Sequence, residues 1–162
     1  MNKKKGGKIA AVIDIGSNLL KMRICQLRKG EIVTLDRLQY PLNLGHEVFT
    51  GGKISFESLR ELSSILHGYS DIMAEYGVDQ YKVVATTALR EAKNRAYVLD
   101  QLKIQNDMTV EVLEDSQEKT LIYSEILAGL QTMAPQKMGN ALISYIGAGT
   151  IGLSVFDGQN MV

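Results

Sequence analysis

The sequence has little of several residue types, and each shortage excludes a class of protein. Cys25 is its one cysteine, so no disulfide can form within the chain, which favours a reducing compartment. Lys plus Arg number 18 and Asp plus Glu number 18, so there is no net charge with which to coat nucleic acid or a membrane surface. The apolar run IAAVI stops at Asp14 and is too short for a signal-peptide core or a membrane span. We therefore expect a soluble, cytoplasmic protein that binds neither nucleic acid nor a membrane.

The residues that are abundant predict a mixed α/β fold. Hydrophobic residues make up 45% of the 162, enough for one domain or slightly more. Apolar runs between polar turns predict strands at 8–15, 19–27, 31–42, 81–85 and 109–113, and a hairpin at 140–147 and 151–156. Helices are predicted at 56–76, 88–94 and 95–105, and from a cap at Asp115 to about 133. This order is typical of an α/β domain whose mixed sheet opens with an antiparallel β-hairpin and is flanked by helices.

Residues at turns and helix ends refine this prediction. Ser55 is a good N-cap for the helix at 56–76, and Gly77 is its stop. Lys29-Gly30 predicts a tight turn between the second and third strands. The short connections among the first three strands therefore predict an antiparallel meander.

Two segments of the chain resemble each other. VIDIGSN at 12–18 and ISYIGAG at 143–149 each contain an apolar strand, Ile-Gly and two small residues, followed by a second strand. This indicates either a duplicated domain, with two loops facing each other across a cleft, or a chance likeness between hairpins. Gly-rich loops expose N–H groups that bind phosphate, and Asp14 would hold a divalent cation that bridges to the phosphate. The alternative is that Asp14 only shapes a turn at the end of its strand.

Four segments together resemble one protein family. They are DIGSN (14–18), ATTALREAKN (85–94), LEDSQEKTLIYSEIL (113–127) and YIGAGT (145–150). In order and spacing they are similar to motifs of the exopolyphosphatase and guanosine pentaphosphate phosphohydrolase (Ppx/GppA) family. The resemblance runs from about residue 8 to 158 and implies a ribonuclease-H-like lobe of the actin-like ATPase superfamily. It also implies hydrolysis of terminal phosphoanhydride bonds of polyphosphate or guanosine pentaphosphate, with Mg²⁺ as cofactor.

The resemblance implies roles for individual residues. Glu118 would be the catalytic base, Asp14 the metal-site acid, and Arg90 a phosphate ligand. The first phosphate loop would consist of Gly16, Ser17 and Asn18, and the second of Gly147, Gly149 and Thr150. Such a set suits phosphoryl transfer, which depends on charge neutralisation and an aligned water molecule.

The resemblance also implies a division into domains. Residues 1–8 would be a disordered basic N-terminus, and 9–125 the first actin-like lobe. Residues 126–162 would be a linking helix and the opening hairpin of a second, truncated lobe. A sheet left unfinished in this way presents a free edge, so a homodimer is a further expectation.

The second loop departs from the family pattern and leaves the function open. The family has Asp at the position of Tyr145, and Ser-Thr-Glu where this chain has Thr-Ile-Gly at 150–152. A tyrosine cannot replace a carboxylate that holds Mg²⁺ through oxygen. The chain is therefore either a phosphoanhydride hydrolase or a non-catalytic relative that binds polyphosphate, a guanosine alarmone or a partner protein. An ATP-using actin-like kinase is a third hypothesis, but such kinases lack the segment at 85–94.

Glu118 and Arg90 each have a structural interpretation as well. DSQE at 115–118 is also a capping-box pattern, in which Glu118 would bond back to the N-cap residue. Arg90 could pair with a nearby carboxylate on a solvated face. Its position just after a strand and a Thr-Thr turn favours a cleft instead.

Overall fold

The computed structural model describes residues 7–133, 139–147 and 149–157. The chain divides into two compact units, Met1–Val112 and Leu113–Val162, called unit 1 and unit 2 below. Most of the predicted basic N-terminus, residues 1–6, lies outside the described residues, as do residues 158–162 after the last hairpin. The lobe boundary expected at residue 125 stays a prediction.

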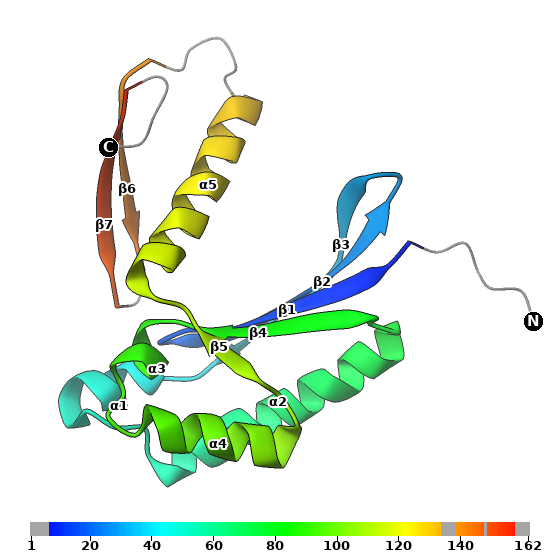
Figure 1. The fold of residues 1–162 in the computed structure, drawn as a ribbon, viewed down its shortest axis with the longest axis vertical. Helices are drawn as coiled ribbons and strands as arrows, with labels where there is room; N and C mark the ends of the chain where they lie inside the picture. The colour runs from blue at the N-terminus through cyan, green and yellow to red at the C-terminus, as the bar shows by residue number, and fades with distance from the viewer. Residues whose placement is uncertain (1–6, 134–138, 148, 158–162) are drawn as a thin grey trace, which may run out of the picture. The chain divides into compact units, whose positions relative to one another are not determined.

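Unit 1 is built on a five-stranded mixed sheet with the order β3-β2-β1-β4-β5 (Figure 1). Its strands are β1 (Ile9–Ile15), β2 (Leu19–Arg28), β3 (Glu31–Pro41), β4 (Gln80–Ala85) and β5 (Val110–Val112). The first three strands form an antiparallel meander, and β4 and β5 extend the sheet from β1 in parallel. The α/β class and the ribonuclease-H-like lobe are thus confirmed. The predicted turn at Lys29-Gly30 is confirmed too, with both residues at positive φ (52° and 88°).

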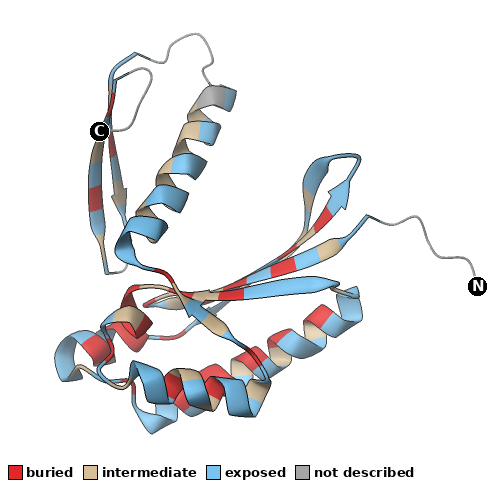
Figure 2. Cartoon of the chain, viewed as in Figure 1, coloured by how far each residue is buried: buried red, intermediate tan, exposed pale blue. Residues whose placement is uncertain are grey.

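Four helices lie on one face of this sheet (Figure 1). They are α1 (Leu44–Gly51), α2 (Phe56–Tyr76), α3 (Thr87–Glu91) and α4 (Arg95–Asn106). In β1, β2 and β4 the buried residues alternate along the strand and point toward them, as the period of two requires. The fully buried core side chains include Ile13, Ile15, Leu20, Met22, Ile24, Leu62, Leu66, Val83, Leu89 and Leu102. The buried colour in Figure 2 accordingly follows the sheet-facing stripes of α2 and α4.

The predicted ends of α2 are confirmed. The Ser55 hydroxyl oxygen accepts a hydrogen bond from the Ser58 N–H at 3.1 Å, and Gly77 ends the helix at φ 65°. The helix predicted at 88–94 is shorter, because Ala92 adopts an extended conformation after Glu91. The Asn94 side chain then exchanges two hydrogen bonds with the backbone of Ile54, which fixes the chain between α3 and α4.

Helix α1 was not among the predicted elements. It begins after Asn43 and ends at Gly52, whose φ is 73°. Glu47 in its first turn accepts hydrogen bonds from the Ser55 N–H and hydroxyl (both 2.9 Å) and from the Ser58 hydroxyl (2.7 Å). One carboxylate therefore ties α1 to the start of α2.

We expect acid to remove the contribution of Glu47 to stability. Burial raises the pKa of its carboxyl group, but the hydrogen bonds from Ser55 and Ser58 outweigh burial and hold the pKa below the ordinary 4.5. Because the folded-state pKa is lowered, this stabilisation is present above about pH 4.5 and is lost as the pH falls through the folded-state value.

The urea midpoint of Glu47→Gln should therefore lie below that of the unaltered chain at pH 7 and approach it near pH 3. Glu61→Gln, on the exposed side of α2, is the matched control and should show no such convergence. An equal difference between Glu47→Gln and the unaltered chain at both pH values would contradict the prediction.

Unit 2 consists of helix α5 (Asp115–Met133) and an antiparallel hairpin of β6 (Ala141–Ile146) and β7 (Ile151–Phe156). The predicted second hairpin is confirmed. Its face that carries Tyr145 and Gly152 also carries the buried side chains Ile143 and Phe156. None of the helices within the described ranges combines the length and apolarity needed to cross a membrane.

Candidate functional site

The ends of β1 and β4 bring the predicted site residues of unit 1 together. These strands are parallel neighbours, with Ile15 paired to Ala85, so both end at the same edge of the sheet. The Thr86 N–H donates a hydrogen bond to the Ile15 carbonyl oxygen at 3.3 Å, just where both strands finish. The loop at 16–18 and helix α3, which carries Arg90, therefore begin side by side. In α/β sheets, ligands bind at this carboxyl edge.

Backbone hydrogen bonds fix the first loop. The Gly16 N–H donates to the Leu19 carbonyl oxygen at 3.0 Å, which closes the turn between β1 and β2. A Cβ at Gly16 would lie 2.9 Å from that oxygen, so the turn requires glycine. The carbonyl oxygens of Ser17 and Asn18 accept hydrogen bonds from Gly45 (2.8 Å) and Leu42 (3.0 Å). These bonds hold the loop in place, with the carbonyl groups of Ser17 and Asn18 already bonded.

Gly45 supports the loop and was missed in the sequence. A Cβ at Gly45 would lie 2.9 Å from the Ser17 Cβ, so the first turn of α1 packs directly on the loop. The sequence does contain a signal for α1. Asn43 is a favoured N-cap type, Glu47 follows in the first turn, and Leu44 and Val48 are spaced four apart.

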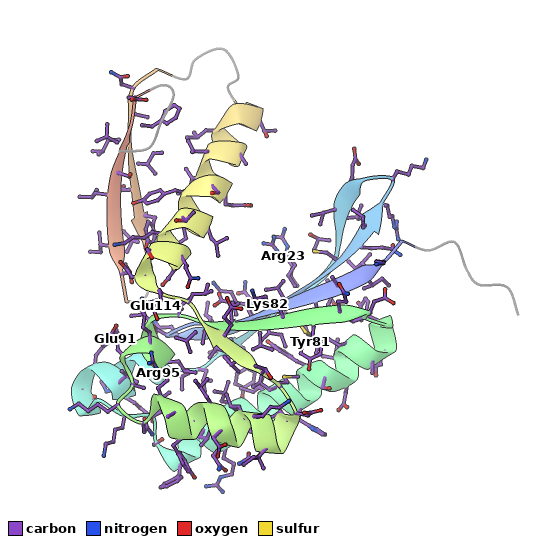
Figure 3. All side chains as sticks on the ribbon, in the orientation of Figure 1. Arg23, Tyr81, Lys82, Glu91, Arg95 and Glu114 are labelled. Carbon is purple, nitrogen blue, oxygen red and sulfur yellow. The ribbon has the colours of Figure 1, made fainter. Side chains whose placement is uncertain are left out.

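Asp14 lies on the sheet face opposite the core. Its side chain is 37% exposed, and its Oδ2 lies 4.0 Å from Nζ of Lys21, its cross-strand partner. Ile13 and Ile15, on either side, take the core-facing positions, so Asp14 is not a buried acid. Arg23 and Lys82, on the strands beside β1, also point away from the helices (Figure 3), and Lys82 pairs with Glu111 of β5 at 2.8 Å.

The donor set around Asp14 fits Mg²⁺ only in part. The described residues contain no group of three or more His, Cys, Asp or Glu side chains that could hold a metal ion. Mg²⁺ keeps several waters and is commonly held by one or two carboxylates together with substrate phosphates. Asp14 therefore does not form a closed protein site for Mg²⁺.

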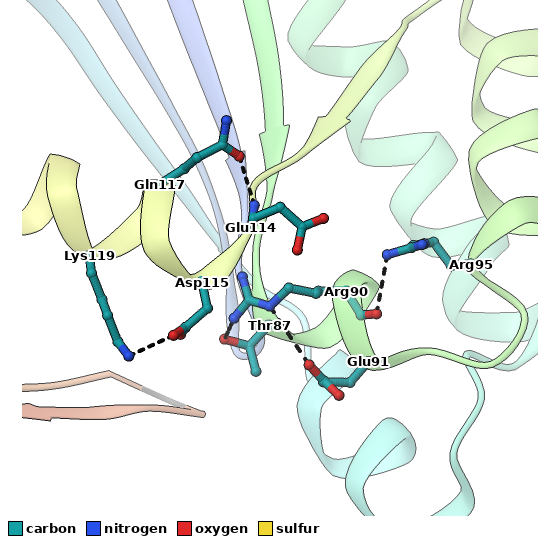
Figure 4. Close-up of polar contacts among 8 residues, drawn as sticks. All are labelled: Thr87, Arg90, Glu91, Arg95, Glu114, Asp115, Gln117 and Lys119. Atoms are coloured by element: carbon teal, nitrogen blue, oxygen red, sulfur yellow. Dashed lines mark hydrogen bonds and ion pairs between the residues drawn. The ribbon is translucent and has the colours of Figure 1, made fainter.

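Arg90 is held in place within α3. Its Nη2 donates to the Thr87 hydroxyl at 3.2 Å, and its Nε lies 3.7 Å from a Glu91 carboxylate oxygen (Figure 4). The side chain is only 10% exposed, so Arg90 does not lie on the solvated face that the structural interpretation assumed. The neighbouring Arg95 donates to the Arg90 carbonyl oxygen at 3.5 Å. Thr87 was not singled out in the sequence, although it is the second residue of the Thr-Thr turn.

In unit 2, the start of α5 differs from the predicted capping box. The Gln117 side chain accepts a hydrogen bond from the Glu114 N–H at 2.9 Å (Figure 4). The Glu114 carbonyl oxygen accepts a hydrogen bond from the Glu118 N–H at 3.0 Å. Glu114 is therefore the N-cap, and Asp115 is the first helical residue. The bond that the capping-box interpretation gave to Glu118 is made by Gln117. Asp115 instead pairs with Lys119 at 2.6 Å.

The second predicted loop is the turn between β6 and β7. The Gly147 N–H donates to the Thr150 carbonyl oxygen at 2.7 Å, which closes the turn that also contains Gly149. Tyr145 and Gly152 are direct cross-strand partners just outside it. A Cβ at Gly152 would overlap the Tyr145 ring. The two main departures from the family pattern are therefore in contact with each other.

Comparisons with known proteins agree with this arrangement. A model described as the Ppx/GppA phosphatase family matches residues 23–138, which include Arg90 and Glu118. The crystal structure of the Aquifex aeolicus Ppx/GppA family member is 25% identical, with a TM-score of 0.78 over 96% of this chain and 50% of its own. A structure of an exopolyphosphatase from Cytophaga hutchinsonii shows the same fold, with a TM-score of 0.83 at 24% identity over 96% of this chain and 48% of its own. The chain thus spans about half the length of these solved relatives.

Proposed function

The chain belongs to the Ppx/GppA phosphatase family, and from this premise we propose that it takes part in hydrolysing the terminal phosphoanhydride bond of inorganic polyphosphate or guanosine pentaphosphate. The observation that carries the proposal is the register of β1 and β4, which gathers Asp14, the loop at 16–18 and Arg90 at one sheet edge. Backbone N–H groups and a guanidinium together can bind a phosphate group.

The proposed chemistry gives each group one role. Glu118 accepts a proton from a water molecule whose oxygen attacks the terminal phosphorus, and the bond from that phosphorus to the bridging oxygen breaks. Inorganic phosphate and a phosphate chain shorter by one unit leave. Arg90 and the loop N–H groups stabilise the charge on the transferred group. Mg²⁺, when bound with substrate, neutralises further charge on the phosphates.

The test is phosphate release with Mg²⁺, measured separately on polyphosphate and on guanosine pentaphosphate. The chain should be assayed as it stands and within any longer natural version. Release from one substrate supports the proposal and names that substrate. No release from either, in either form of the protein, would reject hydrolysis.

A second function is favoured by Tyr145 and Gly152. These residues remove two carboxylates that the family pattern has in the second loop. A protein with one intact phosphate loop and Arg90 can bind polyphosphate or a guanosine alarmone without turnover. Calorimetric binding of polyphosphate in the absence of phosphate release would favour this second function.

Asp14 gives a prediction about magnesium. Asp14→Asn keeps the size of the side chain but removes the charge that attracts the cation, so the Mg²⁺ concentration for half-maximal release should rise roughly 10- to 100-fold. Asp71→Asn, on the exposed side of α2, is the control and should leave the requirement unchanged. An unchanged Mg²⁺ requirement in Asp14→Asn would contradict the metal role and leave Asp14 only with shaping the turn at the end of its strand.

A further inference from the structure

The Tyr145 ring has a fixed place in unit 2. It lies over Gly152 on the neighbouring strand, in the space that any larger side chain there would fill. It forms a T-shaped pair with the Tyr123 ring of α5, with centroids 6.0 Å apart and planes at 84°. Aromatic rings cover glycines in this way on paired strands, and edge-to-face pairs are favourable. The position of the phenol hydroxyl is therefore set by packing on both sides.

The hydroxyl itself is not satisfied by this packing. Its oxygen is buried, and among the described residues it has no hydrogen-bond partner. Buried hydroxyl groups are nearly always paired, because an unpaired one loses its bonds to water without replacement. The Tyr145 hydroxyl is thus an unused hydrogen-bond donor at the end of β6, two residues before Gly147 of the predicted second phosphate loop.

The surroundings of the hydroxyl are charged. Burial raises the pKa of Tyr145 most, and the nearby charges of Glu118, Tyr123 and Asp115 raise it further, against a smaller lowering by Lys119. The phenol therefore stays protonated and able to donate. Lys119 is already paired with Asp115. A neutral donor next to carboxylates can touch a phosphate oxygen directly, whereas an Asp at this position would need a cation between them.

We propose that Tyr145, seated on Gly152, contacts the substrate: its hydroxyl donates a hydrogen bond to a phosphate oxygen bound beside Glu118. This inference rests on the proposed function. It makes Tyr145, which departs from the family pattern, a substrate-binding residue. Gly152 is the position that makes room for it.

Titration calorimetry with inorganic tripolyphosphate and Mg²⁺ tests the contact. Tyr145→Phe keeps the ring on Gly152 and Tyr123 but removes the donor, so the dissociation constant should rise about 5- to 10-fold. Tyr123→Phe is the matched control and should bind as the unaltered chain does. Equal binding by Tyr145→Phe and the unaltered chain would overturn the proposal. An equal loss in both variants would also overturn it, because the effect would then not be specific to the Tyr145 hydroxyl.

Melting temperatures test whether Gly152 makes room for the Tyr145 ring. Gly152→Ala should lower the melting temperature by several degrees in the presence of Tyr145, because the new Cβ displaces the ring. In a Tyr145→Ala background the same change should have little effect. A similar loss in both backgrounds would show that Gly152 does not serve to seat Tyr145.

The outcome for this contact is distinct from that for hydrolysis. Tripolyphosphate binding that weakens in Tyr145→Phe, without phosphate release by the unaltered chain, would support the contact and favour the second, non-catalytic function. Release that is unchanged in Tyr145→Phe, together with unchanged binding, would support the enzyme and reject the contact. No binding of tripolyphosphate by the unaltered chain would overturn the contact, whereas hydrolysis is rejected only if phosphate is released from neither substrate.

Discussion

Replacing Glu118 with Gln should lower phosphate release about 10²- to 10⁴-fold, the range that a general base contributes to a reaction. The amide has the size and helix propensity of the carboxylate but cannot take the proton of the attacking water. The cap bond at the start of α5 is made by Gln117, so this bond remains in the variant. The melting temperature of Glu118→Gln should therefore match that of the unaltered chain while its kcat falls.

Glu125→Gln is the control, because Glu125 is an exposed carboxylate two turns further along the same helix. It should leave both kcat and stability unchanged. Release by Glu118→Gln within threefold of the unaltered protein would remove Glu118 from the mechanism. The carboxylate would then have to be explained by its charge near the start of a helix, where the dipole favours it.

Replacing Arg90 with Lys should also strongly reduce phosphate release. Arg90→Lys keeps a positive charge but loses the planar fork that can hold a phosphate with two parallel bonds. Because the Arg90 side chain is 10% exposed, its charge is poorly screened, and kcat/KM should fall roughly 30-fold or more. Most of the loss should appear as a higher KM if Arg90 grips the substrate in its ground state.

Arg95→Lys is the matched control for Arg90→Lys. Arg95 is an exposed arginine a few residues further along, and its bond to the Arg90 carbonyl oxygen is long. This variant should keep kcat/KM within about twofold of the unaltered protein. A similar drop in both variants would indicate a general effect of positive charge, and no drop in Arg90→Lys would leave Arg90 with a structural role through Thr87.

Much of the fold could be predicted from local patterns. The apolar runs of β1 and β2, the Ser55 cap and the Gly77 stop all depend on neighbours within a few residues, and the strands and helix ends that they predict are confirmed. Helix α1 was missed because it is eight residues long and contains a glycine near its start. The capping box was predicted one residue too late. DSQE at 115–118 and EDSQ at 114–117 both end in a residue that can bond back to the N-cap, and only the bond from the Glu114 N–H to the Gln117 side chain decides between them.

The candidate site was harder to predict than the elements that carry it. The motifs pointed to Asp14, the loop at 16–18 and Arg90, but their common edge depends on which strands pair. The contact between Tyr145 and Gly152 depends in turn on the hairpin register. A one-residue slip would have put Tyr145 on the other face, and no local pattern excludes such a slip. Pairwise contacts of this kind require the assembled backbone.

The pairing of β1 with β4 also has a consequence for how the protein acquires its site. Strands β1, β2 and β3 are joined by short turns, so they can pair through local contacts. The Ile9–Asp79 contact at the start of the β1–β4 pair, in contrast, joins residues 70 positions apart. Closing so long a loop costs more chain entropy than closing a hairpin and slows folding. We therefore expect the meander to form early in folding and the sheet edge at the ends of β1 and β4, near Arg90, to form late. During refolding, phosphate binding should then return after most of the β-structure is already in place.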